Sequence, residues 1–264
     1  MNKYLAVLKN SFQEHFAYRL NFILWRVRMV VSILISFFLW QTIFRSRDTV
    51  FGYREAQMLT YILLITFIGS IVLSTQTFRV AEEINFGRLS DFLIRPIHYF
   101  GYVFSRDIAD KLINTIFSFF ELGLLILLLH PPLILQSGSL WLGLFFLSVV
   151  FAAILYFEIG MLLSFIGFWS KETWAPRFVF YILVVFLACT YFPLDIFPPP
   201  IYNILQLLPF TYLVFFPIKI YLGKVEIAFL LKGFLLMLVW IMLLWYLMKI
   251  LWRKGLKLYT AEGQ

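Results

Sequence analysis

Long runs of hydrophobic residues dominate the chain, and short polar segments separate them. Five runs, at about 22–44, 56–78, 108–130, 139–168 and 227–251, are long enough for a helix to cross a bilayer, which needs about 20 apolar residues. A further apolar run, 178–192, predicts a sixth span that ends near Phe192. The pattern therefore predicts an all-α membrane protein with six transmembrane helices.

The segment after the sixth run is apolar but rich in proline. It holds six of the chain's ten prolines: Pro193, Pro198, Pro199, Pro200, Pro209 and Pro217. Proline breaks helix interiors, and broken backbone at membrane depth survives only where protein or a water-filled cavity covers it. We therefore expect segment 193–223 to be a broken, re-entrant segment before the last span, on its outer side.

The N-terminal segment, 1–21, is mixed in character, and we expect it not to be a cleavable signal sequence. Its larger apolar residues recur at steps of three or four: Leu5, Leu8, Phe12, Phe16 and Leu20. This spacing predicts an amphipathic helix lying in the membrane interface. An ordinary lead-in to the first span fits the same residues, and both descriptions can hold together.

Composition supports a membrane protein without a soluble domain, so we treat 1–264 as one transmembrane domain. Hydrophobic residues make up 62% of the chain and charged residues 14%, against roughly 25% charged residues in soluble domains. The net charge of +8 indicates contact with anionic lipid and the positive-inside bias rather than nucleic-acid binding. Most of the lysines and arginines fall on the inner side when the N-terminus is inside, which predicts two cytoplasmic termini.

The sequence offers no group of residues typical of a catalytic or metal site. His15, His98 and His130 lie far apart, and Cys189 is the single cysteine, so we expect no catalytic residue, metal or disulfide. The phosphate-binding pattern G-x-x-x-x-G-K-[ST] is absent. We expect the chain to bind no cofactor of its own and to have no ATP site of this kind.

The inner loop 79–107, between the second and third spans, is the most informative polar segment. Glu82 and Glu83 open it, which favours a helix N-terminus, and Leu89, Phe92, Leu93 and Ile97 follow at helical spacing. Pro96 limits regular helix just before it. These residues predict a short amphipathic helix on the cytoplasmic face, for which a plain interfacial connector is the alternative.

This loop resembles the cytoplasmic loop of ABC-2 type transporter permeases, in which an acid, a glycine, a leucine, an apolar pair and a proline follow in order. The matching residues are Glu83, Gly87, Leu89, Phe92, Leu93 and Pro96. Arg88 stands where the family commonly has threonine, and an acid is displaced to Asp91, which indicates a divergent branch. Residues 201–223, including Leu208-Pro209-Phe210-Thr211, are similar to the family's outer re-entrant segment, and 1–21 to its interfacial helix.

The resemblance implies a permease subunit of an ATP-driven exporter in the plasma membrane, typically the bacterial inner membrane. It would move a hydrophobic or amphiphilic substrate (a drug, lipid, glycan or natural product) out of the cytoplasm or inner leaflet. Two copies of a separate cytoplasmic ATPase would carry ATP and Mg, and a second permease, homologous rather than identical, would complete the pore. The coupling residues would be Glu82, Glu83, Gly87, Leu89, Asp91, Phe92, Leu93 and Pro96. The acids would pair with basic groups of the ATPase, and Leu89 and Leu93 would fill an apolar slot.

Two acids, Glu121 and Glu158, lie inside predicted spans, where ionisable residues are costly and often functional. They could line a pathway, carry a proton, or pair with Arg26 or Arg28. The step Gly160-x-x-x-Ser164 beside Glu158 predicts close helix packing and favours a structural role. Three alternatives stay open: a proton-coupled secondary transporter using these acids, a membrane-embedded lipid-modifying enzyme, and a structural membrane partner.

Overall fold

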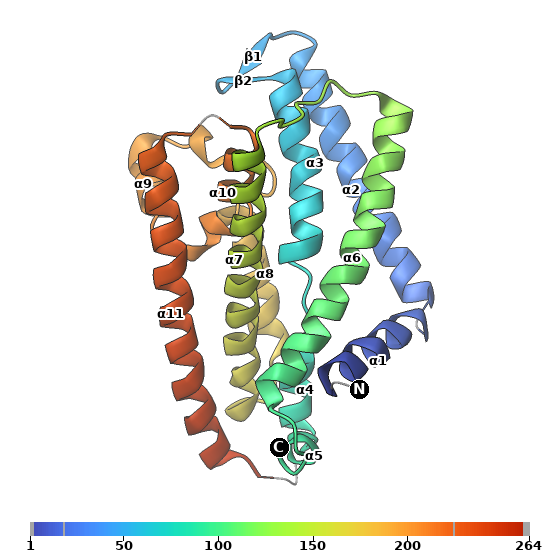
Figure 1. Cartoon of the computed structure of the whole chain (residues 1–264), viewed down its shortest axis with the longest axis vertical. Coiled ribbons are helices and arrows are strands. Elements are labelled where there is room, and N and C mark those ends of the chain that lie inside the picture. The colour runs from blue at the N-terminus through green and yellow to red at the C-terminus, as the bar shows by residue number, and fades with distance from the viewer. Residues whose placement is uncertain (1–2, 18, 224, 261–264) are drawn as a thin grey trace.

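The computed structural model describes residues 3–17, 19–223 and 225–260, and it is built almost entirely of helices (Figure 1). Within these residues, five helical segments are long and apolar enough to cross a membrane. They lie in α2 (Arg19–Phe44), α3 (Glu55–Val72), α6 (Tyr99–Leu129), α7 (Ser139–Ser164) with its 3-10 extension η1 (Phe165–Phe168), and α11 (Ile227–Leu258). The all-α membrane class is thus confirmed.

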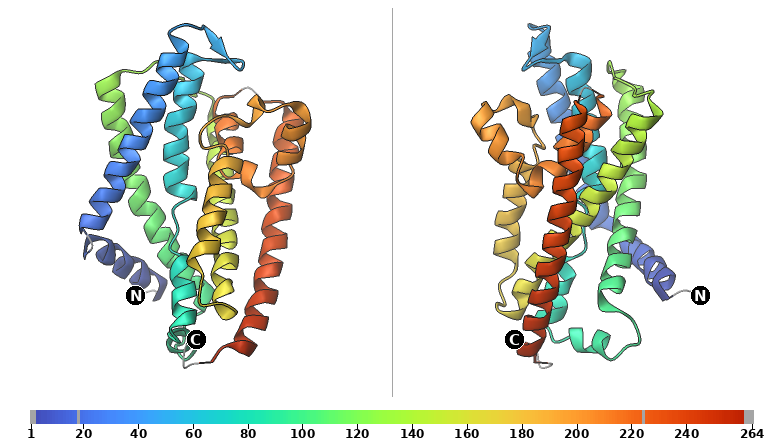
Figure 2. Two further views of the ribbon diagram at one scale, coloured as in Figure 1. Left: turned by 180° about the vertical axis from the view of Figure 1, so that it is seen from behind. Right: turned by 60° about the vertical axis from the view of Figure 1, so that its left-hand side comes forward.

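The two ends of the helical bundle differ in what they carry. At one end, called basal here, lie α1 (Lys3–Ala17), α4 (Phe78–Asn85) and α5 (Leu89–Leu93), as Figures 1 and 2 show. The opposite, apical end carries an antiparallel hairpin of β1 (Thr49–Val50) and β2 (Tyr53–Arg54). Phe51 and Gly52 both have positive φ, 53° and 78°, as the tight mirror-image hairpin turns require.

The predicted sixth span is shorter than expected. Helix α8 (Trp174–Leu187) has 14 residues, whereas the sequence pattern predicts helix to about Phe192. The helix ends early because Cys189 adopts a left-handed φ of 60°, and the Thr190 hydroxyl donates to the Val185 carbonyl at 2.8 Å. Pro193 then follows and prevents the helix from resuming.

The proline-rich segment 193–223 folds as short helices. These are η2 (Leu194–Ile196), α9 (Pro199–Leu205), η3 (Pro209–Tyr212) and α10 (Phe215–Tyr221). The part Pro199–Leu205 meets the part Pro209–Tyr221 at a bend of 79°. This is the broken geometry that the prolines predict, and the described chain has six spans if the bent pair counts as one.

Helix α1 lies beside the basal part of α6 rather than apart from the bundle. Leu8 and Phe12 are half-buried, but Leu5 is 59% exposed. Gly101 of α6 permits this contact, because a Cβ there would lie 2.8 Å from the Tyr4 ring. Residues 1, 2 and 18 of the predicted interfacial helix lie outside the described residues.

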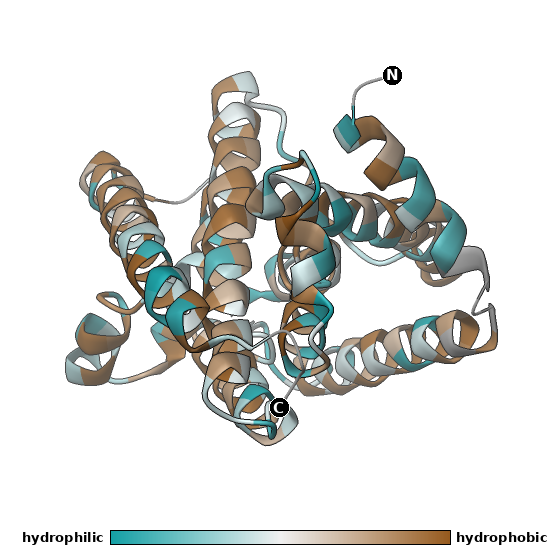
Figure 3. Cartoon of the chain, turned by 90° about the horizontal axis from the view of Figure 1, so that it is seen from below, coloured by the Kyte–Doolittle hydropathy of each residue, from teal (hydrophilic) through white to brown (hydrophobic). Residues whose placement is uncertain are grey.

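The main hydrophobic cluster joins α3, α7, α10 and α11. Phe216 of α10 is fully buried and packs closely against Gly233 of α11, where an added Cβ would come within 2.1 Å of the Phe216 ring. Seen from below, the lengths of the long helices are mostly hydrophobic (Figure 3). Apolar residues therefore face outward as well as inward, as in a protein whose solvent is lipid.

At the apical end, an ion pair joins the hairpin to the broken segment. Lys219 Nζ lies 2.8 Å from Asp195 Oδ2, and the Tyr53 hydroxyl donates to the same carboxylate at 2.9 Å. Burial, and next the charge of Asp195, raise the pKa of Tyr53 above its ordinary value, so the hydroxyl keeps its proton for this bond. The hairpin is thereby held against η2 and α10.

Candidate functional site

The helix is broken between α3 and α4, over residues 73–77, and α6 supplies hydrogen-bond partners for this stretch. Asp107 accepts hydrogen bonds from the Thr75 hydroxyl at 2.6 Å and from the Gln76 N–H at 3.2 Å. The ammonium of Lys111 donates to the carbonyls of Val72 and Ser74 and lies 3.2 Å from Asp107. Because unsatisfied backbone groups are costly away from water, these two side chains stabilise the break.

These partners explain why the third span starts earlier than the hydrophobic pattern predicts. The sequence predicts a start near residue 108, but α6 begins at Tyr99. Arg106, Asp107 and Lys111 are buried on one face of the helix rather than exposed in a loop. Asp107 and Lys111 are four residues apart, and Arg106 precedes Asp107, at the start of an apolar run. This spacing is the sequence signal that could have predicted a buried charged face on the helix.

The acidic residues of the predicted coupling helix have different roles from those expected. Helix α4 begins at Phe78, so Glu82 and Glu83 lie in its second turn rather than at its start. Glu83 is buried, forms a 2.7 Å ion pair with Arg106, and accepts a hydrogen bond from the Tyr99 hydroxyl at 2.5 Å. The prediction that Glu83 pairs with a partner protein is therefore wrong in this structure, because its carboxylate is already engaged internally.

Gly87 separates α4 from α5, so the predicted single helix is two short ones. Its φ of 71° is left-handed, a conformation that glycine adopts without steric cost. Its carbonyl accepts hydrogen bonds from the Ser90 hydroxyl and the Tyr259 hydroxyl, both at 2.6 Å. The Tyr259 oxygen in turn accepts from the Ser90 N–H at 3.1 Å, which ties this turn to the end of α11.

Only part of the predicted coupling set is available to a partner. Leu89 is fully buried in a cluster with α7 and α11, so the prediction that it fills an external slot is wrong. Phe92 is half-buried and packs on Tyr102, with ring centroids 4.6 Å apart. The exposed members are Glu82, Asp91, Leu93 and Pro96.

The same basal surface has exposed residues that the sequence argument did not single out. Phe86 is 69% exposed and Ile94 is 85% exposed. Arg88, which marked the departure from the family pattern, is exposed over the Phe86 ring, 5.3 Å from its centroid. We call Phe86, Arg88, Asp91, Leu93 and Ile94 the basal tip. The sequence spacing does not reveal which residues of this segment are exposed, because that depends on contacts with distant parts of the chain.

The two acids predicted inside spans lie in different surroundings. Glu121 forms a two-pronged ion pair with Arg26, at 2.6 and 2.7 Å, and Arg26 also donates to Asn114 at 3.2 Å. Glu158 is 3% exposed, and its Oε2 has no hydrogen-bond partner among the described residues. The expected pairing of Glu121 with Arg26 is present.

The predicted close packing at Gly160 and Ser164 is also present. A Cβ at Gly160 would lie 2.4 Å from Thr77 Oγ1, so α7 touches the chain break directly. The Ser164 hydroxyl donates to the Thr77 carbonyl at 2.7 Å, and Arg177 of α8 donates to the Ser164 oxygen at 2.6 Å. Three elements therefore meet at the break.

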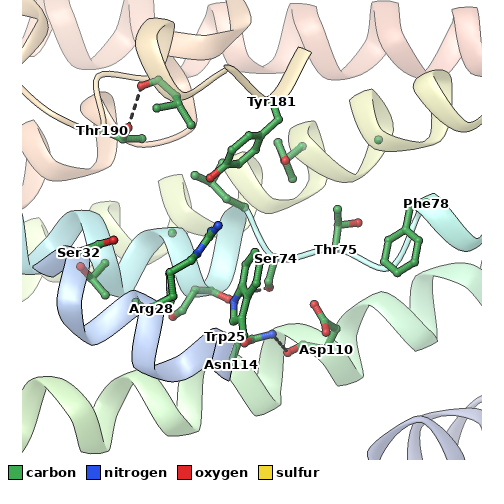
Figure 4. Close-up of a pocket in the computed structure, with 18 of the residues that line it drawn as sticks. Trp25, Arg28, Ser32, Ser74, Thr75, Phe78, Asp110, Asn114, Tyr181 and Thr190 are labelled. Atoms are coloured by element: carbon green, nitrogen blue, oxygen red, sulfur yellow. Dashed lines mark hydrogen bonds between the residues drawn. The ribbon is translucent and has the colours of Figure 1, made fainter. Parts of the chain in front are cut away.

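A cavity of about 960 Å³ opens beside the break, between α2, α3, α7 and α8. Figure 4 shows Trp25 and Arg28 entering it from α2, opposite Tyr181 of α8. Hydroxyl and amide groups of Ser74, Thr75 and Asn114 form part of its wall. Neither Glu121 nor Glu158 lines this cavity.

Comparison with known proteins agrees with this architecture. The model of a family described as "ABC-2 family transporter protein" matches residues 30–263. No curated protein matches the chain.

Proposed function

The chain belongs to the ABC-2 transporter family, whose model covers nearly all of it, and on that basis we propose that it is the permease subunit of an ATP-driven exporter. The family is one of membrane-spanning transport subunits rather than enzymes, and its permeases generally work with an ABC ATPase. The export direction, the coupling surface and the composition of the complex are the proposed part.

The basal tip is the observation that supports the coupling proposal best. Leu93 and Ile94 are 47% and 85% exposed at the end of the molecule, in a segment that also exposes the charges of Arg88 and Asp91. Exposed apolar residues rimmed by charges are typical of a protein–protein contact. We propose that the tip docks on the ATPase.

Rigid connections behind the tip could transmit the motion of the ATPase. Glu83 links α4 to α6 through Arg106 and Tyr99, and Gly87 links the tip to α11 through Tyr259. A displacement of the tip would therefore move several spans together. ATP binding would bias two arrangements of the complex, with the γ-phosphate as the ligand.

The proposed complex places the basal end in the cytoplasm of a plasma membrane, with two ATPase copies that carry ATP and Mg. A second permease, homologous rather than identical, would close the cavity on its open side. The substrate would be hydrophobic or amphiphilic, since the cavity wall is mostly apolar and opens between helices with lipid-facing surfaces. It would enter from the cytoplasm or the inner leaflet.

Co-purification tests this proposal. The full chain would be tagged, extracted gently from native membranes, and its partners identified by mass spectrometry. We expect a soluble subunit that contains G-x-x-x-x-G-K-[ST], and ATP hydrolysis by the complex. Recovery of the chain alone, without ATP hydrolysis, would contradict the exporter assignment.

A matched pair of variants tests the docking surface. Leu93→Asp introduces a charge into the basal tip, and Leu135→Asp introduces the same charge at an 83% exposed apical position. We expect Leu93→Asp to lose the ATPase while still inserting into the membrane, and Leu135→Asp to keep it. Retention of the ATPase by both variants would show that the tip is not the contact.

A further inference from the structure

The cavity between α2 and α8 contains two arginines whose contacts are all uncharged, and we propose that it binds an amphiphile with a phosphate or carboxylate headgroup. The proposal deepens the proposed function, because it names the substrate class of the exporter's cavity. It rests on the charges that line the cavity, on their partners, and on their position along it.

The charged residues of the wall divide into paired and unpaired groups. Arg26 is neutralised by Glu121, and Arg79 by Glu14 at 2.6 Å. Asp110 accepts a hydrogen bond from the Gln76 side chain at 2.8 Å and has further interactions. Arg28 and Arg177 are the remaining charged residues that line the cavity.

The contacts of these two arginines are to neutral groups. Arg28 lies over the Trp25 ring, with its guanidinium carbon 4.2 Å from the ring centroid. Arg177 donates to the Ser164 hydroxyl at 2.6 Å, and at 3.4 Å to the Thr77 hydroxyl and the Gly160 carbonyl. Among the described residues, no carboxylate forms a salt bridge with either arginine, and the acid whose charge acts on Arg177, Glu82 of α4, does so without direct contact.

An arginine inside a membrane-spanning helix is costly unless a partner or water compensates its charge. Arg28 is the tenth residue of α2, within its basal half, and Figure 4 shows its side chain reaching across the cavity toward Tyr181. The planar guanidinium matches phosphate and carboxylate oxygens, which it can bind through two parallel hydrogen bonds. An anionic ligand would therefore supply the negative charge that Arg28 and Arg177 do not find as a salt-bridge partner in the wall, whereas a cationic ligand would be repelled by them.

The position of the charges argues for an amphiphile rather than a small anion. Arg28, Arg79 and Arg177 line the basal part of the cavity, whereas Ile62 and Val185 line it farther toward the apical end. A headgroup would lie at the basal end with its hydrocarbon chain pointing apically. The volume of about 960 Å³ lies near the upper end of ordinary ligand sites, roughly 300–1,000 Å³.

Binding can be measured without the ATPase. The purified full chain would be placed in nanodiscs of phosphatidylcholine, and dodecyl phosphate, dodecylphosphocholine and dodecyltrimethylammonium would be added, each with a bromine on the part of its chain next to the headgroup. Bromine quenches nearby tryptophans, and Trp25 and Trp174 line the cavity, so the double variant Trp25→Phe, Trp174→Phe tests whether the quenching arises there. We expect the dissociation constant of dodecyl phosphate to be at least tenfold lower than those of the other two.

Variants connect the selectivity to the arginines. Arg28→Gln should raise the dissociation constant of dodecyl phosphate about tenfold, and Arg177→Gln should do the same, whereas Arg177→Lys keeps the charge and should raise it less. Arg253→Gln removes an exposed charge of α11 away from the cavity and should change nothing. If Arg177→Gln disturbs folding, Arg28→Gln alone tests the proposal. Arg28 is the safer site to change, because the contact described for it is with the Trp25 ring.

Brominated phosphatidic acid, with two chains, distinguishes the source of the headgroup. If it binds as well as dodecyl phosphate, the ligand is a membrane lipid; if only dodecyl phosphate binds, it is a single-chain acidic amphiphile. Equal binding of all headgroups, tighter binding of the trimethylammonium compound, or no effect of Arg28→Gln would overturn the proposal. If the chain co-purifies with an ATPase but binds all headgroups equally, this inference fails and the exporter assignment stands. If the chain binds dodecyl phosphate selectively but no ATPase co-purifies, the exporter assignment fails and this inference stands.

Discussion

At the scale of single residues, the same side-chain type has different consequences according to its partners. Arg26 and Glu121 are 9% and 15% exposed and neutralise each other, whereas Glu14 and Arg79 form an equally short pair that is 45% and 27% exposed. A buried pair is costly to break, because the remaining charge is left without a partner in a poorly solvated site. An exposed pair contributes little, since water replaces the partner.

This contrast gives a stability prediction. Arg26→Met or Glu121→Met alone should destabilise the purified chain by about 3–5 kcal/mol, and the double variant should recover most of the loss because no unpaired charge remains. The corresponding changes at Arg79 and Glu14 should each cost less than about 1 kcal/mol. Thermal unfolding in detergent measures both series; equal losses in the two pairs would contradict the assigned role of burial.

The coupling residues show how far sequence reasoning reaches at this scale. The sequence alone could identify Gly87 as important. It matches the glycine of the family pattern, and a glycine at a fixed position in such a pattern indicates a backbone conformation that other residues rarely adopt. The burial of Glu83 and Leu89 could not, because their partners, Arg106 and the α7–α11 cluster, come from later in the chain. Residue type predicts what a side chain can do, but its contacts decide whether it is free to do so.

At the scale of elements, hydrophobic runs predicted the long helices well and their ends poorly. A run of 20 apolar residues has few structural alternatives in lipid, so α2, α7 and α11 follow the pattern. Helix α6 extends past its apolar run because Asp107 and Lys111 are satisfied by the break at residues 73–77. These hydrogen bonds and the ion pair are tertiary contacts, and the hydropathy of a single segment does not predict them.

The contact between α7 and the break gives an element-scale prediction. Gly160→Ala should destabilise the chain by about 1–3 kcal/mol, as overpacking does, because the new methyl group would meet Thr77 at 2.4 Å. Gly143→Ala is the matched control in the same helix, since a Cβ there has no described neighbour within 4 Å. It should be neutral or stabilising by up to about 1 kcal/mol through helix propensity.

Thermal unfolding of the two glycine variants, side by side, measures the difference. An unchanged midpoint for Gly160→Ala would mean that α7 and residues 73–77 are not in close contact. A loss of stability in Gly143→Ala as large as in Gly160→Ala would mean that both changes act through the bilayer-facing helix itself rather than through the contact.

At the scale of the whole molecule, the two ends are built for different tasks. The basal end presents the tip and the charged part of the cavity, whereas the apical end is held by the Tyr53, Asp195 and Lys219 cluster. Helix α4, which lies between the break and the basal tip, packs against α7 and is tied to α6 by the Glu83–Arg106 ion pair. A force applied at the tip would therefore reach the cavity wall before it reached the apical cluster.

This arrangement is useful to an exporter only if the basal end lies in the cytoplasm, which makes orientation the decisive whole-molecule prediction. In a Cys189→Ala background, Leu135→Cys places a thiol at the apical end and Lys257→Cys places one at the basal end, both at exposed positions. A membrane-impermeant maleimide should label Leu135→Cys in intact spheroplasts, but Lys257→Cys only after the membrane is opened. The reverse pattern would put the basal tip outside, where no ATPase could reach it, and the coupling role would have to be abandoned.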